Sequence, residues 1–144
     1  MKKYLKIIAA LGSLGLIAGI FVFVFVVNKS HPDYEHKKPD FTLTVSELYS
    51  TYQNDNVKGS ATYDGKVVQV SGALSAVEIS GNDTYVCFVL NEGMFGAEGV
   101  RVRMLENQKK PSQKLEPGQV VAIKGFVTGY NETDVVLEHG SIVQ

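Results

Sequence analysis

Arginine and aromatic residues in the second half of the chain are the ones most suited to binding a ligand. Arg101 and Arg103 alternate with valines in the run Val100–Met104, so both would lie on one face of a strand. A guanidinium group recognises phosphate and carboxylate groups, and the rings of Tyr85 and Phe95 could stack on bases. Alternatively, these residues form no more than a solvated strand face and part of a core.

Residues that could support catalysis or bind a metal ion do not form a recognised motif. His31, Glu35 and His36 are close together in a polar stretch, but no helix fixes their spacing, and His139 is distant. The single cysteine, Cys87, lies in an apolar run and is expected to be a buried structural thiol. There is no phosphate-binding loop, nucleophile elbow or metalloprotease helix motif. We therefore predict no catalytic residue, no metal site, no cofactor and no enzymatic activity.

An apolar segment near the N-terminus determines the expected location. Residues 7–27 carry no charge and, as a helix, would span about 31 Å, the thickness of the hydrocarbon core. Lys2, Lys3 and Lys6 precede it, so residues 1–6 are expected in the cytoplasm and the C-terminal part outside. A cleaved signal peptide is the alternative, but the segment is long and lacks small residues at its end. The expectation is a single-pass cell-membrane protein with an extracytoplasmic domain.

Two glycines within the apolar segment could support helix association. Gly15 and Gly19 form a small-xxx-small pair, which lets two membrane helices approach closely. The segment is therefore a possible contact for a protein partner or a second copy of the chain. The alternative is that the two glycines have no role in association, since glycine is common in membrane helices.

The charge balance argues against a general nucleic-acid binder. The whole chain has a formal net charge of −1, but three of its 14 basic residues precede the apolar segment. The external part therefore carries 11 basic and 15 acidic residues, a net charge of about −4. Proteins that bind nucleic acid without sequence preference normally present a basic surface to the phosphates. Nucleic acid is therefore not the expected partner.

The external part divides into a linker and one domain. Residues 28–43 are polar, contain Pro32 and Pro39, and are expected to be a linker. Residues 44–144 would form the domain, beginning with a Thr44–Glu47 capping box. The helix behind this box carries an apolar stripe and should cover one end of the domain. The stripe consists of Val45, Leu48, Tyr49 and Tyr52.

Five strands are expected after the helix, with a glycine-rich loop at residues 93–99 and a longer polar connection at residues 105–116. The strands lie near residues 68–76, 85–90, 100–104, 120–128 and 135–143. The segments 65–72 and 118–125 share a pattern of turn glycine, apolar strand and mid-strand glycine. A glycine inside a strand often marks a bend, and two bent strands suit a small closed barrel.

Several segments together resemble a known family. They are Ser46-Glu47-Leu48-Tyr49, Asn54, Ala61, Tyr63-Asp64-Gly65-Lys66-Val67-Val68-Gln69-Val70-Ser71-Gly72, residues 115–125, and Asp134-Val135-Val136-Leu137-Glu138. In these segments the chain resembles the tRNA-anti-like family of OB-fold proteins. The resemblance implies a mainly β fold, a five-stranded OB-like barrel, in a small extracytoplasmic protein without an established activity. Many members carry a lipidated cysteine where this chain has its apolar segment.

An OB-fold most often binds ligands across its second and third strands and the flanking loops. On that basis we predict Tyr85, Phe95, Arg101 and Arg103 as the ligand-binding residues. The predicted function is a non-catalytic binding or interaction module on the outside of the membrane, with an unknown ligand. The alternatives are a single-stranded nucleic-acid-binding OB domain and a structural subunit of an envelope membrane complex.

Overall fold

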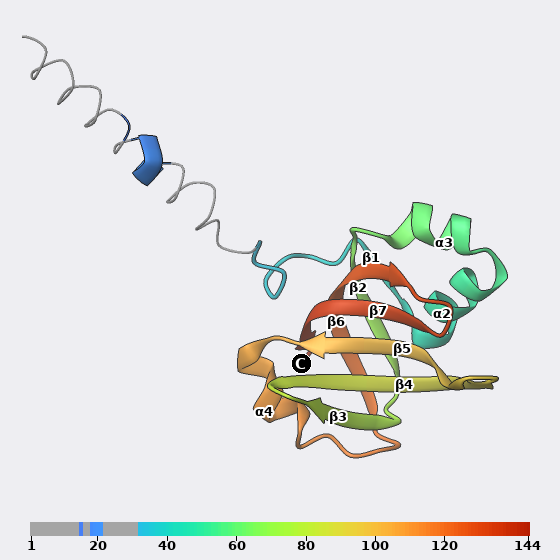
Figure 1. Cartoon of the computed structure of the whole chain (residues 1–144). Coiled ribbons are helices and arrows are strands. Elements are labelled where there is room, and N and C mark those ends of the chain that lie inside the picture. Colours follow the sequence, from blue (N-terminus) through green and yellow to red (C-terminus); the bar gives the residue numbers. More distant parts are fainter. Residues whose placement is uncertain (1–14, 16–17, 22–31) are drawn as a thin grey trace, which may run out of the picture. The chain divides into compact units, whose positions relative to one another are not determined.

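The computed structural model describes Gly15, residues 18–21 and residues 32–144 (Figure 1). The chain forms two compact units, Met1–Pro32 and Asp33–Gln144. Most of the predicted membrane segment 7–27 lies outside the described residues. Gly15 and Gly19 are helical and exposed, and a Cβ atom added to either would contact nothing within 4 Å. No helix within the described ranges is both long and apolar enough to cross a bilayer.

The second unit is built on one seven-stranded sheet with the order β1-β2-β6-β7-β5-β4-β3. The five expected strands are all present, so the mainly β prediction is confirmed. The expectation of only five strands needs correction, because β1 and β3 are additional and these two end strands do not pair with each other. The strands are β1 (Phe41–Thr44), β2 (Val67–Ala73), β3 (Ala76–Ser80), β4 (Asp83–Gly93), β5 (Gly96–Met104), β6 (Val120–Tyr130) and β7 (Asp134–Ile142).

The segment from Asp33 to Leu43, which we expected to belong to the linker, is part of the folded unit. β1 lies parallel to β2, with Phe41 opposite Val68. Asp40 fixes this pairing, because its N–H donates to the Val67 carbonyl at 2.7 Å and its carboxylate accepts from the Val67 N–H at 2.9 Å. Backbone hydrogen bonding to the edge of β2 therefore compensates for the low apolar content of this stretch.

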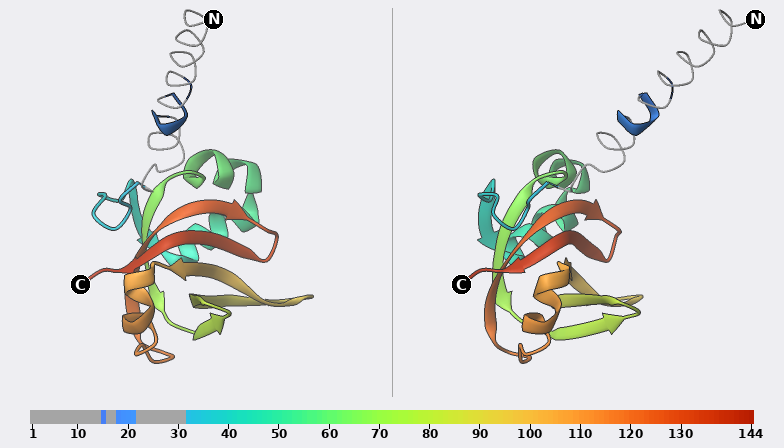
Figure 2. Two further views of the ribbon diagram at one scale, coloured as in Figure 1. Left: turned by 60° about the vertical axis from the view of Figure 1, so that its left-hand side comes forward. Right: turned by 90° about the vertical axis from the view of Figure 1, so that its left-hand side faces the viewer.

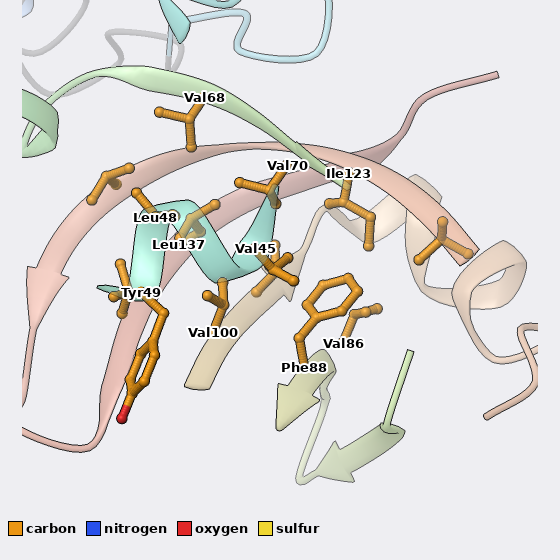
Figure 3. Close-up of a cluster of buried hydrophobic side chains, with 14 of the residues drawn as sticks. Val45, Leu48, Tyr49, Val68, Val70, Val86, Phe88, Val100, Ile123 and Leu137 are labelled. Carbon is orange, nitrogen blue, oxygen red and sulfur yellow. The ribbon is translucent and has the colours of Figure 1, made fainter. Parts of the chain in front are cut away.

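Two helices follow β1: α2 (Val45–Asn54) and α3 (Asn56–Tyr63). The predicted capping box is confirmed, because the Thr44 hydroxyl accepts from the Glu47 N–H and the Glu47 carboxylate accepts from the Thr44 N–H. α2 packs against β2, β4, β5 and β7, and Figure 3 shows Val45, Leu48 and Tyr49 among the side chains of the sheet. The predicted apolar stripe is fully buried: Val45, Leu48, Tyr49 and Tyr52.

Glycines at turns and inside strands set how closely these layers pack. Gly65 and Gly118 have φ values of 74° and 88°, which glycine adopts without strain, so the predicted turn glycines are confirmed. At Gly72 an added Cβ would lie 2.4 Å from Val45, so only glycine lets α2 approach β2 this closely. The β6–β7 register is irregular beside Gly125, between Lys124 and Phe126.

The chain between β2 and β3 changes its hydrogen-bonding partner within two residues. The Leu74 N–H donates to Gln119 and the Leu74 carbonyl accepts from Gly118, both just before β6. The next N–H, of Ser75, donates to the Cys87 carbonyl in β4. The polar connection after β5 contains the short helices η2 (Glu106–Gln108) and α4 (Lys109–Ser112), which lie near the start of β4 (Figure 2).

Candidate binding face

The β4–β5 register brings three of the four predicted ligand-binding residues onto one face of the sheet. Tyr85 lies opposite Arg103, and Cys87 lies opposite Arg101. Their neighbours Val86 and Val102 point into the core and have no exposed surface, so the predicted residues point outward. We call Tyr85, Arg101 and Arg103, together with the carboxylates that contact them, the binding face.

Arg101 is held between an aromatic ring and a carboxylate. Its guanidinium carbon lies 4.9 Å from the centre of the Tyr85 ring, a cation–π contact. The same guanidinium forms an ion pair with Glu78 of β3, the residue that pairs with Tyr85. The ring, the guanidinium and the carboxylate therefore form one continuous patch across β3, β4 and β5.

Arg103 is also paired. Its Nε lies 3.3 Å from the Asp83 carboxylate and its Nη1 lies 3.6 Å from that of Glu138 in β7. Two guanidinium groups on the binding face are thus matched by three carboxylates. The side chains remain about one-third to one-half exposed, so each pair is screened by water and weak. The three carboxylates together leave the face without the excess of positive charge that binding to a phosphate backbone would require.

Cys87 and Asp134 lie beside Arg101 around a small cavity of about 50 Å³. Cys87 is buried, which confirms that part of its prediction. Burial raises the pKa of its thiol to about 11, so the thiol stays protonated and weakly nucleophilic near neutral pH. Burial also raises the pKa of the Asp134 carboxyl, although that group accepts a hydrogen bond from the Gly99 N–H at 3.1 Å.

Phe95 lies apart from the other three predicted residues. The expected glycine-rich loop at 93–99 is wrong, because β4 and β5 stay paired as far as Gly93 and Gly96, leaving Met94 and Phe95 as the turn. Phe95 is ten residues beyond Tyr85, up to about 34 Å along an extended strand, at the end of the hairpin (Figure 1). Its side chain is 88% exposed, and at this distance from Tyr85 it does not belong to the same contact patch.

Sequence reasoning missed a segment that packs on β6 and β7. The Tyr34 ring lies 4.9 Å from the Phe126 ring and stacks on His139 at 4.7 Å. The Glu35 carboxylate accepts from Asn107 and Gln108, and its carbonyl accepts from Lys124. These partners are about 70 to 105 positions away in the sequence, so no local pattern could reveal them.

The histidines weighed as metal ligands have other contacts. His36 lies 2.7 Å from the Asp33 carboxylate, while His139 stacks on Tyr34. Within the ranges that the structure describes, no group of three or more His, Cys, Asp or Glu side chains could hold a metal ion. His31 lies outside those ranges.

A second hollow lies between the β3–β4 turn and α4 and has a volume of about 480 Å³. Lys109 lines it and donates to the Asn82 carbonyl and the Glu106 carboxylate, both at 2.5 Å. Gln113 and Thr84 are hydrogen-bonded to each other across the same hollow. Its polar groups therefore largely satisfy one another.

Comparison with known proteins supports the OB-like assignment. The tRNA_anti-like family model matches residues 1–142. A lipoprotein from Klebsiella pneumoniae, named as a candidate nucleic-acid-binding protein, has a similar structure with a TM-score of 0.56. It is 19% identical in sequence, and the match covers 72% of this chain and 91% of that one.

Two aminoacyl-tRNA synthetases match over about a fifth of their own length. A candidate aspartyl-tRNA synthetase from Leishmania major has a TM-score of 0.45 and 12% identity, covering 81% of this chain and 22% of that one. Asparaginyl-tRNA synthetase from Pyrococcus horikoshii has a TM-score of 0.38 and 19% identity, covering 56% and 20%. A search of curated protein sequences gives no match.

Proposed function

We propose that this chain, which belongs to the tRNA_anti-like family, is a membrane-anchored extracytoplasmic protein whose OB-like domain binds another molecule without catalysing a reaction. The family match supports a binding role, because OB-folds commonly serve as binding modules. Fold alone does not identify the ligand, so the proposal depends on the binding face itself.

The domain corresponds to a five-stranded OB-like barrel if β2 and β3 are taken as one bent strand. Only Leu74 and Ser75 separate them, and the backbone there changes partner from the residues before β6 to β4. One continuous run of chain thus pairs with β6 through its first half and with β4 through its second. In this interpretation β1 is an extra edge strand added beside β2.

The apolar segment supports the anchoring part of the proposal. Residues 7–27 are uncharged and follow three lysines, the pattern of a single-pass segment with its N-terminus in the cytoplasm. The similar Klebsiella protein is a lipoprotein, which agrees with a location outside the cytoplasm. The anchor would keep residues 33–144 at the membrane surface.

The charge pairing on the binding face favours a protein partner over a nucleic acid. Arg101 and Arg103 already contact Glu78, Asp83 and Glu138, so a phosphate group would have to displace carboxylates and would meet their repulsion. A protein surface can instead use the Tyr85 ring and exchange ion pairs with both signs of charge. This mixed surface is the observation that carries the proposal.

Site-specific photocrosslinking of the full chain in its native membrane tests the proposal. A photoreactive phenylalanine derivative at Tyr85 should crosslink to a distinct protein. Arg101→Glu should reduce the yield of this crosslink, because it replaces the guanidinium with a carboxylate that the Glu78 carboxylate repels. The matched control places the same group at Val57, which is 81% exposed, on α3, a helix at the opposite side of the domain from β3 and β4 (Figures 1 and 2). Equal crosslinking from both positions would contradict a specific binding face.

Nucleic-acid binding is the second candidate, favoured by the stacking of Arg101 on Tyr85 within an OB-like fold. A filter-binding titration with short single-stranded DNA and RNA at several salt concentrations separates the two proposals. Salt-sensitive micromolar binding that Tyr85→Ala abolishes would favour the second candidate and contradict the first.

A structural role in an envelope complex depends on the anchor and not on the binding face. If the Gly15–Gly19 pair mediates helix association, Gly15→Leu or Gly19→Leu would disrupt the assembly, as seen by native electrophoresis of detergent-solubilised membranes. An unchanged assembly in both variants would exclude this contact.

A further inference from the structure

The end of the β4–β5 hairpin exposes apolar side chains that no other part of the described chain covers. Met94 is 92% exposed and Phe95 is 88% exposed. Val89 and Leu90, further down the same hairpin, are 40% and 36% exposed. Figures 1 and 2 show the hairpin extending beyond the rest of the sheet. We call residues 91–98 the apolar finger.

The apolar finger is a formed hairpin and not a loose loop. β4 and β5 remain paired to Gly93 and Gly96, so the turn contains only Met94 and Phe95. Near its base, the Glu98 carboxylate accepts from the Tyr49 hydroxyl of α2 at 2.9 Å and from the Asn91 amide at 3.0 Å. The finger is thus tied to α2, whose apolar face is buried, and this lowers the entropy that a contact at its tip would cost.

Charge restricts what the apolar finger can contact. Residues 89–100 contain no lysine or arginine, but they contain Glu92 and Glu98. Glu92 is exposed and has no ion pair within the described part of the chain. An acidic finger is repelled by anionic lipid headgroups. Two fingers that met tip to tip would bring their acidic residues close together, and these residues would repel one another.

We infer that the apolar finger inserts Met94 and Phe95 into an apolar pocket on a partner protein, and that basic residues border this pocket and pair with Glu92. Met94 and Phe95 at the tip supply a large apolar anchor. The Glu92 carboxylate beside them orients the finger in the pocket. Such an arrangement resembles other protein contacts, in which a few buried aromatic side chains carry most of the binding energy.

This contact would be separate from the binding face, because Phe95 and Tyr85 lie ten residues apart on the hairpin. Substitutions at the tip should therefore leave crosslinking at Tyr85 unchanged. Conversely, failure of the proposal for the binding face would not affect the apolar finger. The two contacts can be tested in one set of membranes.

The experiment places a photoreactive phenylalanine derivative at Phe95 in the full chain in its native membrane, with Val57 as the exposed apolar control. The crosslinked protein is identified by mass spectrometry, purified and titrated with the full chain in detergent. Phe95→Ser and Glu92→Lys should each weaken that affinity by about tenfold or more, and added salt should weaken it further. Tyr85→Ala should leave it unchanged.

Four outcomes would overturn the inference. They are crosslinks from Phe95 to lipid alone, crosslinks only to a second copy of the chain, no crosslink, and a protein partner whose affinity does not respond to Glu92→Lys. Because Phe95 and Glu92 are both exposed, neither substitution should impair folding, and thermal melting of each variant checks this.

Discussion

The binding face and the apolar finger belong to the same β-hairpin, but their side chains are in opposite situations. On the binding face each guanidinium already contacts a carboxylate of the same domain, and Arg101 also contacts the Tyr85 ring. At the tip of the finger Met94 and Phe95 are exposed and contact nothing in the described part of the domain that would hide them. The side chains of the first region therefore already have partners within the domain, whereas those at the tip can find them only on another molecule.

Two phenylalanines in the hairpin give the sharpest test of this difference. Phe88 is 1% exposed and packs in the core, while Phe95 is 88% exposed. Phe88→Ala should lower the free energy of unfolding by about 3–5 kcal/mol, because it leaves a cavity. Phe95→Ala should change it by no more than about 0.5 kcal/mol. Denaturant unfolding of the full chain in detergent measures both, and similar losses would show that the tip is packed.

The sequence predicted the binding face better than the finger, and the reason is physical. Alternation of Arg101 and Arg103 with valines fixes which side of a strand they occupy, whatever the rest of the fold does. Phe95 is grouped with them on the ground that loops flanking the second and third strands of an OB-fold often bind ligands, and the glycines at 93, 96 and 99 predict such a loop. In fact Gly99 lies within a paired strand, where an added Cβ would lie 1.9 Å from the Phe88 carbonyl oxygen.

Long-range pairing explains what sequence reasoning did not find. The partners of Arg101 and Arg103 include Glu78 in β3 and Glu138 in β7, which only the sheet order brings close. The pairing of β1 with β2 and the packing of Tyr34 on Phe126 likewise depend on residues distant in sequence. By contrast, the capping box and apolar stripe of α2 are local patterns, and both were predicted correctly.

The hydrogen bond from the Tyr49 hydroxyl of α2 to the Glu98 carboxylate at the base of the finger should keep the finger rigid. Burial and the Glu98 carboxylate raise the pKa of the Tyr49 hydroxyl to about 12, so this hydroxyl remains a hydrogen-bond donor at neutral pH. Tyr49→Phe removes that donor and should cost about 0.5–1.5 kcal/mol of stability. Hydrogen exchange of residues 91–98 should also accelerate.

Tyr85→Phe is the matched control for this change. The Tyr85 hydroxyl has no hydrogen bond among the described residues, so its loss should affect neither stability nor exchange. Unchanged exchange at residues 91–98 in the Tyr49→Phe variant would show that Glu98 does not hold the finger in place.

On the binding face, the Arg101–Glu78 pair should contribute a smaller energy. Both side chains are more than one-third exposed, so a double-mutant cycle with Arg101→Ala and Glu78→Ala should give a coupling of about 0.2–1 kcal/mol. The coupling should decrease in about 1 M salt, where the screening length is about 3 Å. A larger coupling that salt does not reduce would mean that the pair is desolvated and that the face is built mainly for stability.

Asp134 lies between the two regions and should give the smallest effect. Burial raises the pKa of its carboxyl above the ordinary value of 3.8, so the folded state binds the proton more tightly than the unfolded chain. The contribution of this group to stability is therefore greatest below pH 3.8 and is lost as the pH rises through the raised folded value. Asp134→Asn removes the buried charge, so its melting temperature relative to the unaltered chain should rise between acidic and neutral pH. The opposite trend would mean that the hydrogen bond from Gly99 and the nearby Arg101 outweigh burial in the folded protein.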